Sequence, residues 1–531
     1  MLRRSAELDP LVWAVQYREI RGERFVVPPP LVDIYREQAK EVVVAKAAQV
    51  GASEWAVNLA LWAADSRAGG RGIALYVFPA IAQLGDFVRA RIDTAVEESS
   101  YLLGRVRPVR GLEPMGRSTD NVGLKRVGRG FIYFRGSNAK AGLLTVDADI
   151  VLYDEVDRLT EGTLALGAER LGSSLLGWQR YTSTPVYPET GIDALWLKSD
   201  RRRWHVTCPA CNAEQAPTFP DNLREDGQLV CVACHGPLPP AWQAGRWLPE
   251  NPGAEVRGYH VSKFLSPRAD LAKLAKTGYR ILARDETDPS KVQEFWNQGC
   301  GVPHAPEGGQ LSRAELSACL ADYSLGDWTP TGCTMGVDVG GKYHCRINAP
   351  GPGGKARAAF IGSVPGWSDL DALMSRFDVS CCVVDAEPEH HGALQFQQRW
   401  PDRVWLCHYG AGSAWQHQDV AVWNEVEGTV FAHRTMTLDA TFARIRERRI
   451  ELPREALDLP EYAEQMMAPV RIVEKDGRGN PVARYVEGGR ADHLAHSEGY
   501  AWVAESKPGP AIEETVIYND PVMISDYERR W

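Results

Sequence analysis

The feature that most constrains the fold of this chain is a repeated alternation of β-rich and helical segments between residues 41 and 185. Parallel strands need a crossover connection, which is usually a helix, so this alternation predicts an α/β fold with a parallel sheet covered by helices on both faces. We expect strands at residues 41–45, 72–78, 130–134 and 149–153, and helices at 53–64 and 80–98.

The rest of the chain divides by composition into further segments. Residues 1–30 form a lead-in that ends in three prolines, which disfavour helix. Residues 201–250 hold paired cysteines, Pro and Trp but few periodic stretches. A second α/β region begins near Thr331, with strands expected at 333–339, 358–361, 380–384 and 404–406 and a last helix at 491–504. The tail from residue 506 has no clear period, and we expect it to be flexible.

A strand-to-helix connection at residues 42–53 has the order of a phosphate-binding loop. In such a loop, backbone N–H groups at the helix N-terminus contact phosphates, and a hydroxyl such as that of Ser53 holds Mg²⁺. Gly51 and Ser53 fit the pattern GxxxxGK[ST], but Ala52 stands where lysine belongs, and Lys46 stands where the first glycine belongs. Taken alone, the segment is equally compatible with an ordinary strand-to-helix turn.

Two later strands in the same region end in residues suited to nucleotide hydrolysis. The apolar strand at 149–153 ends in Asp154 and Glu155. Asp154 can bind Mg²⁺ through its water shell, and Glu155 can polarise the water that attacks a γ-phosphate. The strand near Tyr181 ends in hydroxyl residues that include Thr184. Each strand end has a plain structural alternative, but their occurrence together favours a nucleotide site.

Four of the 11 cysteines form two CxxC pairs with the spacing C-x2-C-x19-C-x2-C. Each pair can form a tight knuckle, and four thiolates complete a tetrahedral zinc site. A closed four-sulfur site leaves no open position for water, so the metal is expected to be structural. The predicted ligands are Cys208, Cys211, Cys231 and Cys234.

Three carboxylates in the second α/β region stand at the ends of regular elements. Asp338 and Asp385 end two apolar strands, and Asp492 opens the last helix, with Glu387 and His493 as further candidates. Three converging carboxylates repel one another unless a cation binds, so convergence would imply divalent metal. Two such metals can activate a water and stabilise the leaving oxygen of a phosphodiester. Each aspartate singly has a structural alternative as a strand-end or helix N-terminal charge.

Composition excludes several classes of protein. The chain of 531 residues has a formal net charge of −9, so contact with nucleic acid would need local basic patches and metal ions. The chain lacks an apolar run long enough for a membrane span and an N-terminal secretory signal, which indicates a cytoplasmic protein. The candidate basic patches, which can also be solvated surface, are residues 201–203, Lys125 with Arg126 and Arg129, and Arg444, Arg446, Arg448 and Arg449.

With these motifs in order, the chain resembles the large subunit of tailed-phage terminases of the lambda type. Residues 46–53 resemble the family's deviant Walker A motif, in which the lysine moves to the start of the loop. Asp154 and Glu155 resemble the Walker B motif with its catalytic glutamate, and residues 183–185 resemble the coupling motif. The order of Asp338, Asp385 and Asp492 is that of the family's ribonuclease H-like nuclease. The resemblance covers roughly residues 10–505.

The resemblance implies a set of domains and site residues. We expect a lead-in at 1–30, a P-loop ATPase motor domain at 31–200, a zinc ribbon at 201–250, a connecting segment at 251–330, a ribonuclease H-like nuclease domain at 331–505 and a tail at 506–531. The implied nucleotide-binding residues are Lys46, Gln49, Gly51, Ala52, Ser53, Asp154 and Thr184, with Glu155 as the catalytic base. Tyr35 or Gln38 would recognise adenine, and Arg89 or Arg91 would act on a neighbour's nucleotide.

The resemblance also implies ligands, partners and location. The cofactors are ATP, Mg²⁺ (or Mn²⁺ at the nuclease site) and Zn²⁺. The partners are double-stranded DNA, a small terminase subunit, the portal protein of the procapsid and further copies of the chain in a ring, all in the host cell cytoplasm and without a membrane. Two alternatives remain at this point: a helicase-like translocase and nuclease of recombination or repair, and a non-enzymatic, zinc-dependent DNA scaffold.

Overall fold

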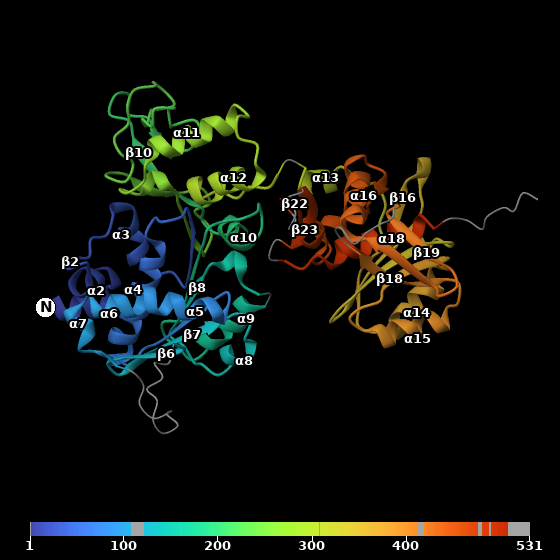
Figure 1. Cartoon of the computed structure of the whole chain (residues 1–531), viewed down its shortest axis with the longest axis horizontal. Helices are drawn as coiled ribbons and strands as arrows, with labels where there is room; N and C mark the ends of the chain where they lie inside the picture. The colour runs from blue at the N-terminus through green and yellow to red at the C-terminus, as the bar shows by residue number, and fades with distance from the viewer. Residues whose placement is uncertain are drawn as a thin grey trace, which may run out of the picture. The chain divides into compact units, whose positions relative to one another are not determined.

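A computed structural model of the chain describes residues 2–107, 122–160, 162–306, 308–410, 419–475, 481–487 and 490–507. The chain forms two compact units (Figure 1). Unit 1 comprises Met1–Ala318 and Ala456–Ala495, and unit 2 comprises Cys319–Glu455 and His496–Trp531. Of the tail that we expect beyond residue 506, residues 508–531 lie outside the described part of the chain.

Unit 1 is built on one large sheet whose strand order is β11-β10-β13-β3-β9-β8-β4-β7-β6-β5, with β12 paired to β10. The strands from β13 to β7 are parallel, as predicted, and β6 and β5 close one end in antiparallel pairing. The bounds are β3 (Glu41–Lys46), β4 (Ile73–Phe78), β5 (Val106–Arg107), β6 (Leu124–Val127), β7 (Gly130–Gly136), β8 (Ile150–Asp154), β9 (Trp178–Ser183), β10 (Arg202–Thr207), β11 (Glu214–Gln215), β12 (Arg246–Pro249) and β13 (Arg257–Val261).

The central strands of this sheet are buried on both faces, as in other sheets covered by helices. Val42 of β3 belongs to a core that includes α4 (Ala52–Ser66), whereas its neighbour Val43 belongs to a separate core that includes α10 (Gly191–Lys198). The other helices of this region are α5 (Ile81–Phe87), α6 (Thr94–Glu97), α7 (Ser100–Leu103), α8 (Lys140–Leu143) and α9 (Thr163–Ala168).

The N-terminal lead-in differs from the expectation of a segment without helix. It contains α1 (Leu2–Leu8) and α2 (Pro10–Tyr17), and the proline run starts α3 (Pro29–Arg36). Proline disrupts the interior of a helix but is favoured in its first turn, where its missing N–H needs no partner. The side chain of Asp9 caps α2 by accepting hydrogen bonds from Leu11 N and Val12 N.

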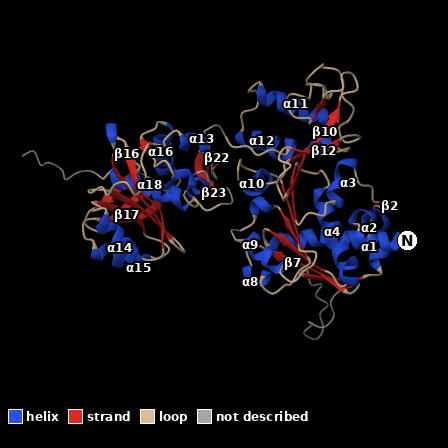
Figure 2. Ribbon diagram, turned by 180° about the vertical axis from the view of Figure 1, so that it is seen from behind, coloured by secondary structure: helices blue, strands red, loops and turns tan. Residues whose placement is uncertain are grey.

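Residues 200–318 are integrated into unit 1. β13 lies beside β3 in the sheet, and β10, from the predicted zinc ribbon, pairs with β13. We expected residues 251–330 to connect two domains, but β13 comes from that segment. Figures 1 and 2 show β10 grouped with α11 (Leu271–Leu282) and α12 (Pro289–Glu294). Unit 1 also holds a π-helical turn, η6 (Phe295–Cys300), α13 (Arg313–Ser317), α17 (Tyr462–Met466) and the hairpin of β22 (Pro469–Lys475) and β23 (Pro481–Glu487).

Unit 2 has a mixed sheet with the order β19-β20-β18-β17-β14-β15-β16-β21. The central strand β14 pairs antiparallel with β15 and parallel with β17, which agrees with the predicted ribonuclease H-like arrangement. The bounds are β14 (Thr334–Val339), β15 (Tyr343–Pro350), β16 (Ala356–Val364), β17 (Cys381–Asp385), β18 (Val404–Gly410), β19 (Ala421–Asn424), β20 (Thr429–His433) and β21 (Ile450–Glu451).

Helices cover both faces of the unit 2 sheet. Figure 2 shows α14 (Trp367–Arg376) and α15 (His390–Arg399) on one side, and α16 (Arg434–Arg446) and α18 (His493–Glu505) on the other. The two faces have separate apolar cores, as expected for a covered sheet. None of the helices in the described ranges is long and apolar enough to cross a membrane.

Candidate functional site

The loop between β3 and α4 has the geometry of a phosphate-binding loop. Lys46 ends β3, and Gly51, with φ of 92°, is the residue before α4. Gly51 is needed there because the left-handed conformation is strained for other residues and an added Cβ would lie 3.1 Å from Leu31 Cδ1. The first N–H groups of a helix have no acceptor within the helix, so those of α4 can bind phosphate.

Lys46 lies opposite the predicted catalytic carboxylate. Its Nζ is 3.3 Å from Oε1 of Glu155, which follows β8. The Lys46 side chain is 8% exposed, so water screens this ion pair less than it would at the surface. Glu155 itself has φ of 54°, a conformation that β-strand residues avoid and that often marks functional sites.

Asp154 ends β8 inside the unit 1 core. Tyr76 of the neighbouring strand β4 donates a hydrogen bond of 2.7 Å to its Oδ2. Burial raises the pKa of Asp154 to about 6, although Lys46 and the Tyr76 hydroxyl favour the charged form. A carboxylate whose charge is this poorly solvated gains from a cation placed beside it.

A further carboxylate, Asp157, connects the end of β8 to the predicted coupling segment. Its side chain accepts hydrogen bonds from Val186 N (3.1 Å) and from Ile192 N in α10 (3.0 Å), while its own N–H donates to Ser183 Oγ (3.3 Å). Burial raises the pKa of Asp157 to about 6. The sequence analysis did not identify Asp157, although its position two residues after Glu155 was a usable signal.

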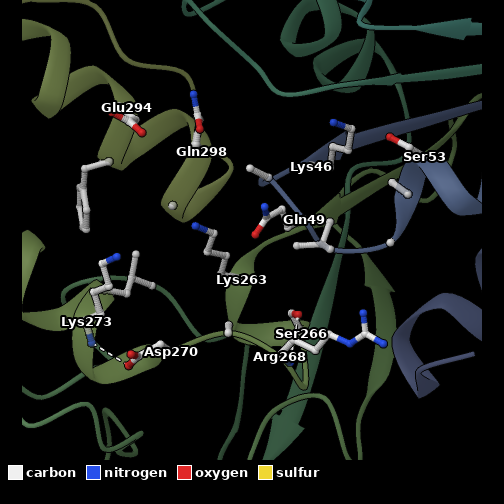
Figure 3. Close-up of a pocket in the computed structure, with 18 of the residues that line it drawn as sticks. Lys46, Gln49, Ser53, Lys263, Ser266, Arg268, Asp270, Lys273, Glu294 and Gln298 are labelled. Carbon is white, nitrogen blue, oxygen red and sulfur yellow. Dashed lines mark hydrogen bonds between the residues drawn. The ribbon is translucent and has the colours of Figure 1, made fainter. Parts of the chain in front are cut away.

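Two neighbouring cavities surround the loop. One, of about 880 Å³, is lined by residues 48–54 on one side and by parts of β13, α11 and η6 on the other (Figure 3). The second, of about 580 Å³, is lined by Lys46, Glu155, Asp157 and Thr184 among others. The structure thus brings the predicted residues Lys46, Gln49, Gly51, Ala52 and Ser53 to one cavity and Glu155 and Thr184 to the other, with Lys46 and Gln49 lining both.

The far wall of the larger cavity was not predicted from the sequence. It includes Lys263, Arg268, Lys273 and Gln298. The backbone fixes this wall to the loop, because Ala48 N donates to Gln298 O at 3.0 Å. These contacts join segments far apart in the chain, and no local motif marks them.

Three of the residues named for nucleotide recognition have other contacts here. Tyr35 is buried and its hydroxyl accepts a hydrogen bond from Asn58, and Gln38 bonds Arg36 O. Neither lines the two cavities. Arg91 lines the larger cavity of its own chain and pairs with Glu54 at 3.2 Å.

The four predicted zinc ligands come together in unit 1. All four sulfur atoms lie within 4.8 Å of one another, and the Sγ–Sγ distances are 3.7 Å for Cys208–Cys234 and for Cys211–Cys231. Four thiolates about 2.3 Å from a tetrahedral zinc ion lie about 3.8 Å apart. The set therefore fits zinc in ligand type, number and spacing.

A buried amide pair supports this cluster. Gln215 Nε2 donates to Cys231 Sγ at 3.0 Å and lowers the pKa of that thiol to about 6, which favours the metal-binding thiolate. Asn222 Nδ2 in turn donates to Gln215 Oε1 at 2.7 Å. Gln215 thus orients a ligand from outside the tetrahedron, as partners of metal ligands commonly do.

Two of the three nuclease aspartates lie side by side in unit 2. Val337 pairs with Val384 across β14 and β17, so the following residues, Asp338 and Asp385, are neighbours. Tyr500 donates a hydrogen bond of 2.9 Å to Asp385 Oδ2. Burial raises the pKa of Asp385 to about 6, and the nearby Asp338 raises it further.

Other predicted ligands stand in different surroundings. His344 is the register partner of Asp338 on β15, and their ligand atoms lie within 4.8 Å, a proximity that the sequence analysis missed. Asp492 is buried and lies in unit 1, directly before α18, and His493 is the first residue of that helix. Glu387 is exposed, and its N–H donates to Asp385 Oδ1.

Many cations of the predicted basic patches are engaged in ion pairs. Arg202 pairs with Asp200 and Glu37, Lys125 with Asp93, and Arg444 with Glu505. Arg203 and Arg449 are paired as well, with Glu250 and Glu447. These pairs reduce the charge that the patches offer to a phosphate backbone.

Two family models match consecutive parts of the chain. The model for the ATPase domain of the phage terminase large subunit gpA matches residues 29–247, and the model for the endonuclease domain of the terminase large subunit gpA matches residues 256–361. Together they cover more than half of the chain. This chain belongs to the phage terminase large subunit family. It carries an ATPase domain and a metal-dependent nuclease domain.

Comparison with solved structures agrees in fold. The large terminase of bacteriophage HK97 is 12% identical, and the match covers 93% of this chain and 99% of that one with a TM-score of 0.51. Lower scores were found for the ADP complex of a large terminase from a thermophilic bacteriophage (10% identity, 93% and 97% coverage, 0.31) and for the magnesium-bound large terminase nuclease of another thermophilic phage (14%, 34% and 84%, 0.22). No curated protein sequence matches this chain.

The family matches bear on the terminase's site residues unevenly. The ATPase model spans Lys46, Asp154, Glu155 and all four clustered cysteines. The endonuclease model spans Asp338 but ends before Asp385, and it begins at β13 of the unit 1 sheet. The individual roles of these residues therefore rest on the geometry described above.

Proposed function

We propose that this terminase subunit hydrolyses ATP at the loop after β3 to drive double-stranded viral DNA into a procapsid. The observation that carries the proposal is the ion pair between Lys46 and Glu155 beside a loop suited to phosphate. In this proposal residues 49–53 contact phosphates through their N–H groups, Ser53 and Asp154 hold Mg²⁺, and Glu155 orients and deprotonates the attacking water. Thr184 senses the γ-phosphate, and Asp157 passes its state to α10.

We propose that Asp338, Asp385 and Asp492 form the nuclease site that makes the cuts at the start and end of packaging. Two Mg²⁺ or Mn²⁺ ions bound there would activate water and stabilise the leaving oxygen of the phosphodiester. The chain's own contribution is to hold the carboxylates charged and oriented, as Tyr500 does for Asp385. The adjacency of Asp338 and Asp385 supports this assignment.

The four-cysteine cluster is proposed to hold one structural Zn²⁺. Zinc stabilises small segments that cannot build a large core of their own. The ligands of the cluster come from turns after β10 and before β12, so the metal would fix these turns where they extend the unit 1 sheet.

We further propose the partners and location expected of such a motor. The subunit would bind the small terminase subunit and the portal protein and act as a homo-oligomeric ring in the host cell cytoplasm. The motor domain would span residues 31–200, with the nuclease at 331–505 and the other segments as expected from the sequence.

The test is DNA-stimulated ATP hydrolysis measured beside metal-dependent cleavage of plasmid DNA by the same purified protein. The proposal predicts both activities, and it predicts that ATP-dependent DNA uptake requires portal-bearing procapsids. ATPase and cleavage without any dependence on procapsids would instead indicate a translocase of recombination or repair. Absence of both activities in folded, zinc-loaded protein would contradict the proposal.

A further inference from the structure

Lys263 emerges at the same edge of the sheet as the phosphate-binding loop. β13 runs parallel to β3, with Val261 as the register partner of Lys46, and Val261 O accepts a hydrogen bond of 2.8 Å from Ala47 N. Two residues later, Lys263 begins the short 3-10 turn that ends at Leu265. Its neighbours Phe264 and Leu265 are buried, so the turn that carries Lys263 is fixed in place.

The Lys263 side chain enters the larger cavity. It is half-buried, and Figure 3 shows it pointing into the space between Gln49 of the loop and Gln298 of η6. Within the described ranges, no carboxylate lies at ion-pairing distance from its Nζ. Its charge is therefore available to a ligand in the cavity.

The other cations of this cavity differ from Lys263 in pairing or in exposure. Lys46 pairs with Glu155, Arg91 with Glu54 and Lys291 with Glu286. The remaining two, Arg268 and Lys273, are exposed on the rim, where water and salt weaken their attraction for phosphate. Lys263 is thus the half-buried cation of the cavity whose charge is not already balanced by a carboxylate among the described residues.

The loop itself creates a need for such a cation. A usual phosphate-binding loop supplies a lysine directly before the Ser or Thr that binds Mg²⁺, and this chain has Ala52 at that position. A nucleoside triphosphate carries about four negative charges, and lysine neutralises phosphate as a compact point charge. Lys46 faces the catalytic carboxylate, which leaves the cavity side of the loop without a cation of its own.

We propose that Lys263 is a second phosphate-binding lysine of the ATP site, supplied by the strand next to the loop in place of the lysine missing at Ala52. The inference rests on the proposed ATPase function and deepens it. Two lysines then act on the bound nucleotide from two directions, Lys46 from the side of Glu155 and Lys263 from the side of α11 and η6.

The test is the affinity for ATP and for AMP with Mg²⁺, measured by isothermal titration calorimetry on protein carrying Glu155→Gln, in which turnover is suppressed. Lys263→Met keeps the aliphatic stem and removes the charge, and Lys263→Arg restores a cation. Lys276→Met is the matched control, because Lys276 is exposed on α11 and does not line the cavity. Melting temperature is recorded for every variant.

We expect Lys263→Met to weaken ATP binding about tenfold or more, with AMP binding and melting temperature nearly unchanged. Lys263→Arg should recover most of the affinity, and Lys276→Met should bind like the parent. Equal ATP affinity in Lys263→Met and Lys276→Met overturns the inference and leaves the ATPase proposal intact. An equal loss of affinity in the Met and Arg variants, with a lower melting temperature, also overturns it. A parent protein that binds no ATP contradicts the ATPase proposal itself, and the inference falls with it.

Discussion

Lys46 and Glu155 meet across the unit 1 sheet, with 3.3 Å between Nζ and Oε1, although the strands that lead to them are separated by β9. The pair joins the first residue of the phosphate-binding loop to the residue proposed to activate water. Binding of a phosphate would give Lys46 a competing anionic partner. Release of Glu155 toward water at that moment would link nucleotide binding to catalysis.

Replacing Lys46 tests whether it does the work of the usual loop lysine. Lys46→Ala should weaken ATP binding by more than about tenfold, because a buried charge-assisted contact to phosphate is lost. Ala52→Lys in the native background should not improve binding, because Lys46 and Lys263 already supply the cations. Affinity is measured by calorimetry with Mg²⁺. Wild-type affinity in Lys46→Ala would place the phosphate site elsewhere.

Replacing Glu155 separates binding from hydrolysis. Glu155→Ala should lower ATP turnover by about 100-fold or more, since no other group orients the water, while leaving ATP bound. Steady-state hydrolysis and calorimetry on the same preparation provide the two readouts. Asp86→Ala is a control, since Asp86 is an exposed carboxylate of the same unit whose ion pair is also exposed. Normal turnover in Glu155→Ala would refute the assignment.

The cysteine cluster predicts about one tightly bound zinc per chain. Cys208→Ser and Cys234→Ser should lose it, and Gln215→Ala should retain it but release it faster to a chelator, because the amide that favours the Cys231 thiolate is gone. Elemental analysis and chelator kinetics measure these effects. Cys300→Ser, a buried cysteine outside the cluster, is the control. Protein purified without chelator and free of zinc would rule out the ribbon.

Metal binding at the nuclease site should depend on pH. The pKa of Asp385 is raised from 3.8 to about 6, so the carboxyl is largely protonated at about pH 5 and must lose its proton before it binds a cation. The apparent Mn²⁺ affinity should therefore fall as pH drops below about 6, by up to about tenfold per pH unit. Titrations by electron paramagnetic resonance measure it. An affinity that stays constant from about pH 7 to about pH 5 would argue against Asp385 as a ligand.

The sequence predicted the elements that carry strong local patterns. The valine-rich strand before Lys46, the apolar strand before Asp154 and the strands that end in Asp338 and Asp385 all occur within a residue or two of their predicted bounds. The four cysteines were also predicted to converge, since their spacing is specific. These features depend on hydrophobic runs and short-range motifs, which a single sequence contains.

Features that depend on long-range contacts were not predicted. β13 and the cavity wall with Lys263 lie beside the loop because of sheet order, and sheet order leaves no mark in a local pattern. The prolines at residues 28–30 were interpreted as disfavouring helix, but proline has the opposite effect at a helix start. Asp157 and Gln215 act through buried hydrogen bonds whose partners are distant in the chain.

The central claim is that one chain holds two separate active sites, and the most direct measurement is ATP hydrolysis and Mn²⁺-supported plasmid cleavage on the same folded preparations of Asp338→Ala and Glu155→Ala. Asp338→Ala should lose cleavage by about 100-fold or more, because the two-metal arrangement is broken, and keep its ATPase. Glu155→Ala should show the reverse. A folded Asp338→Ala protein that still cuts DNA, or one that loses both activities together, would contradict the account.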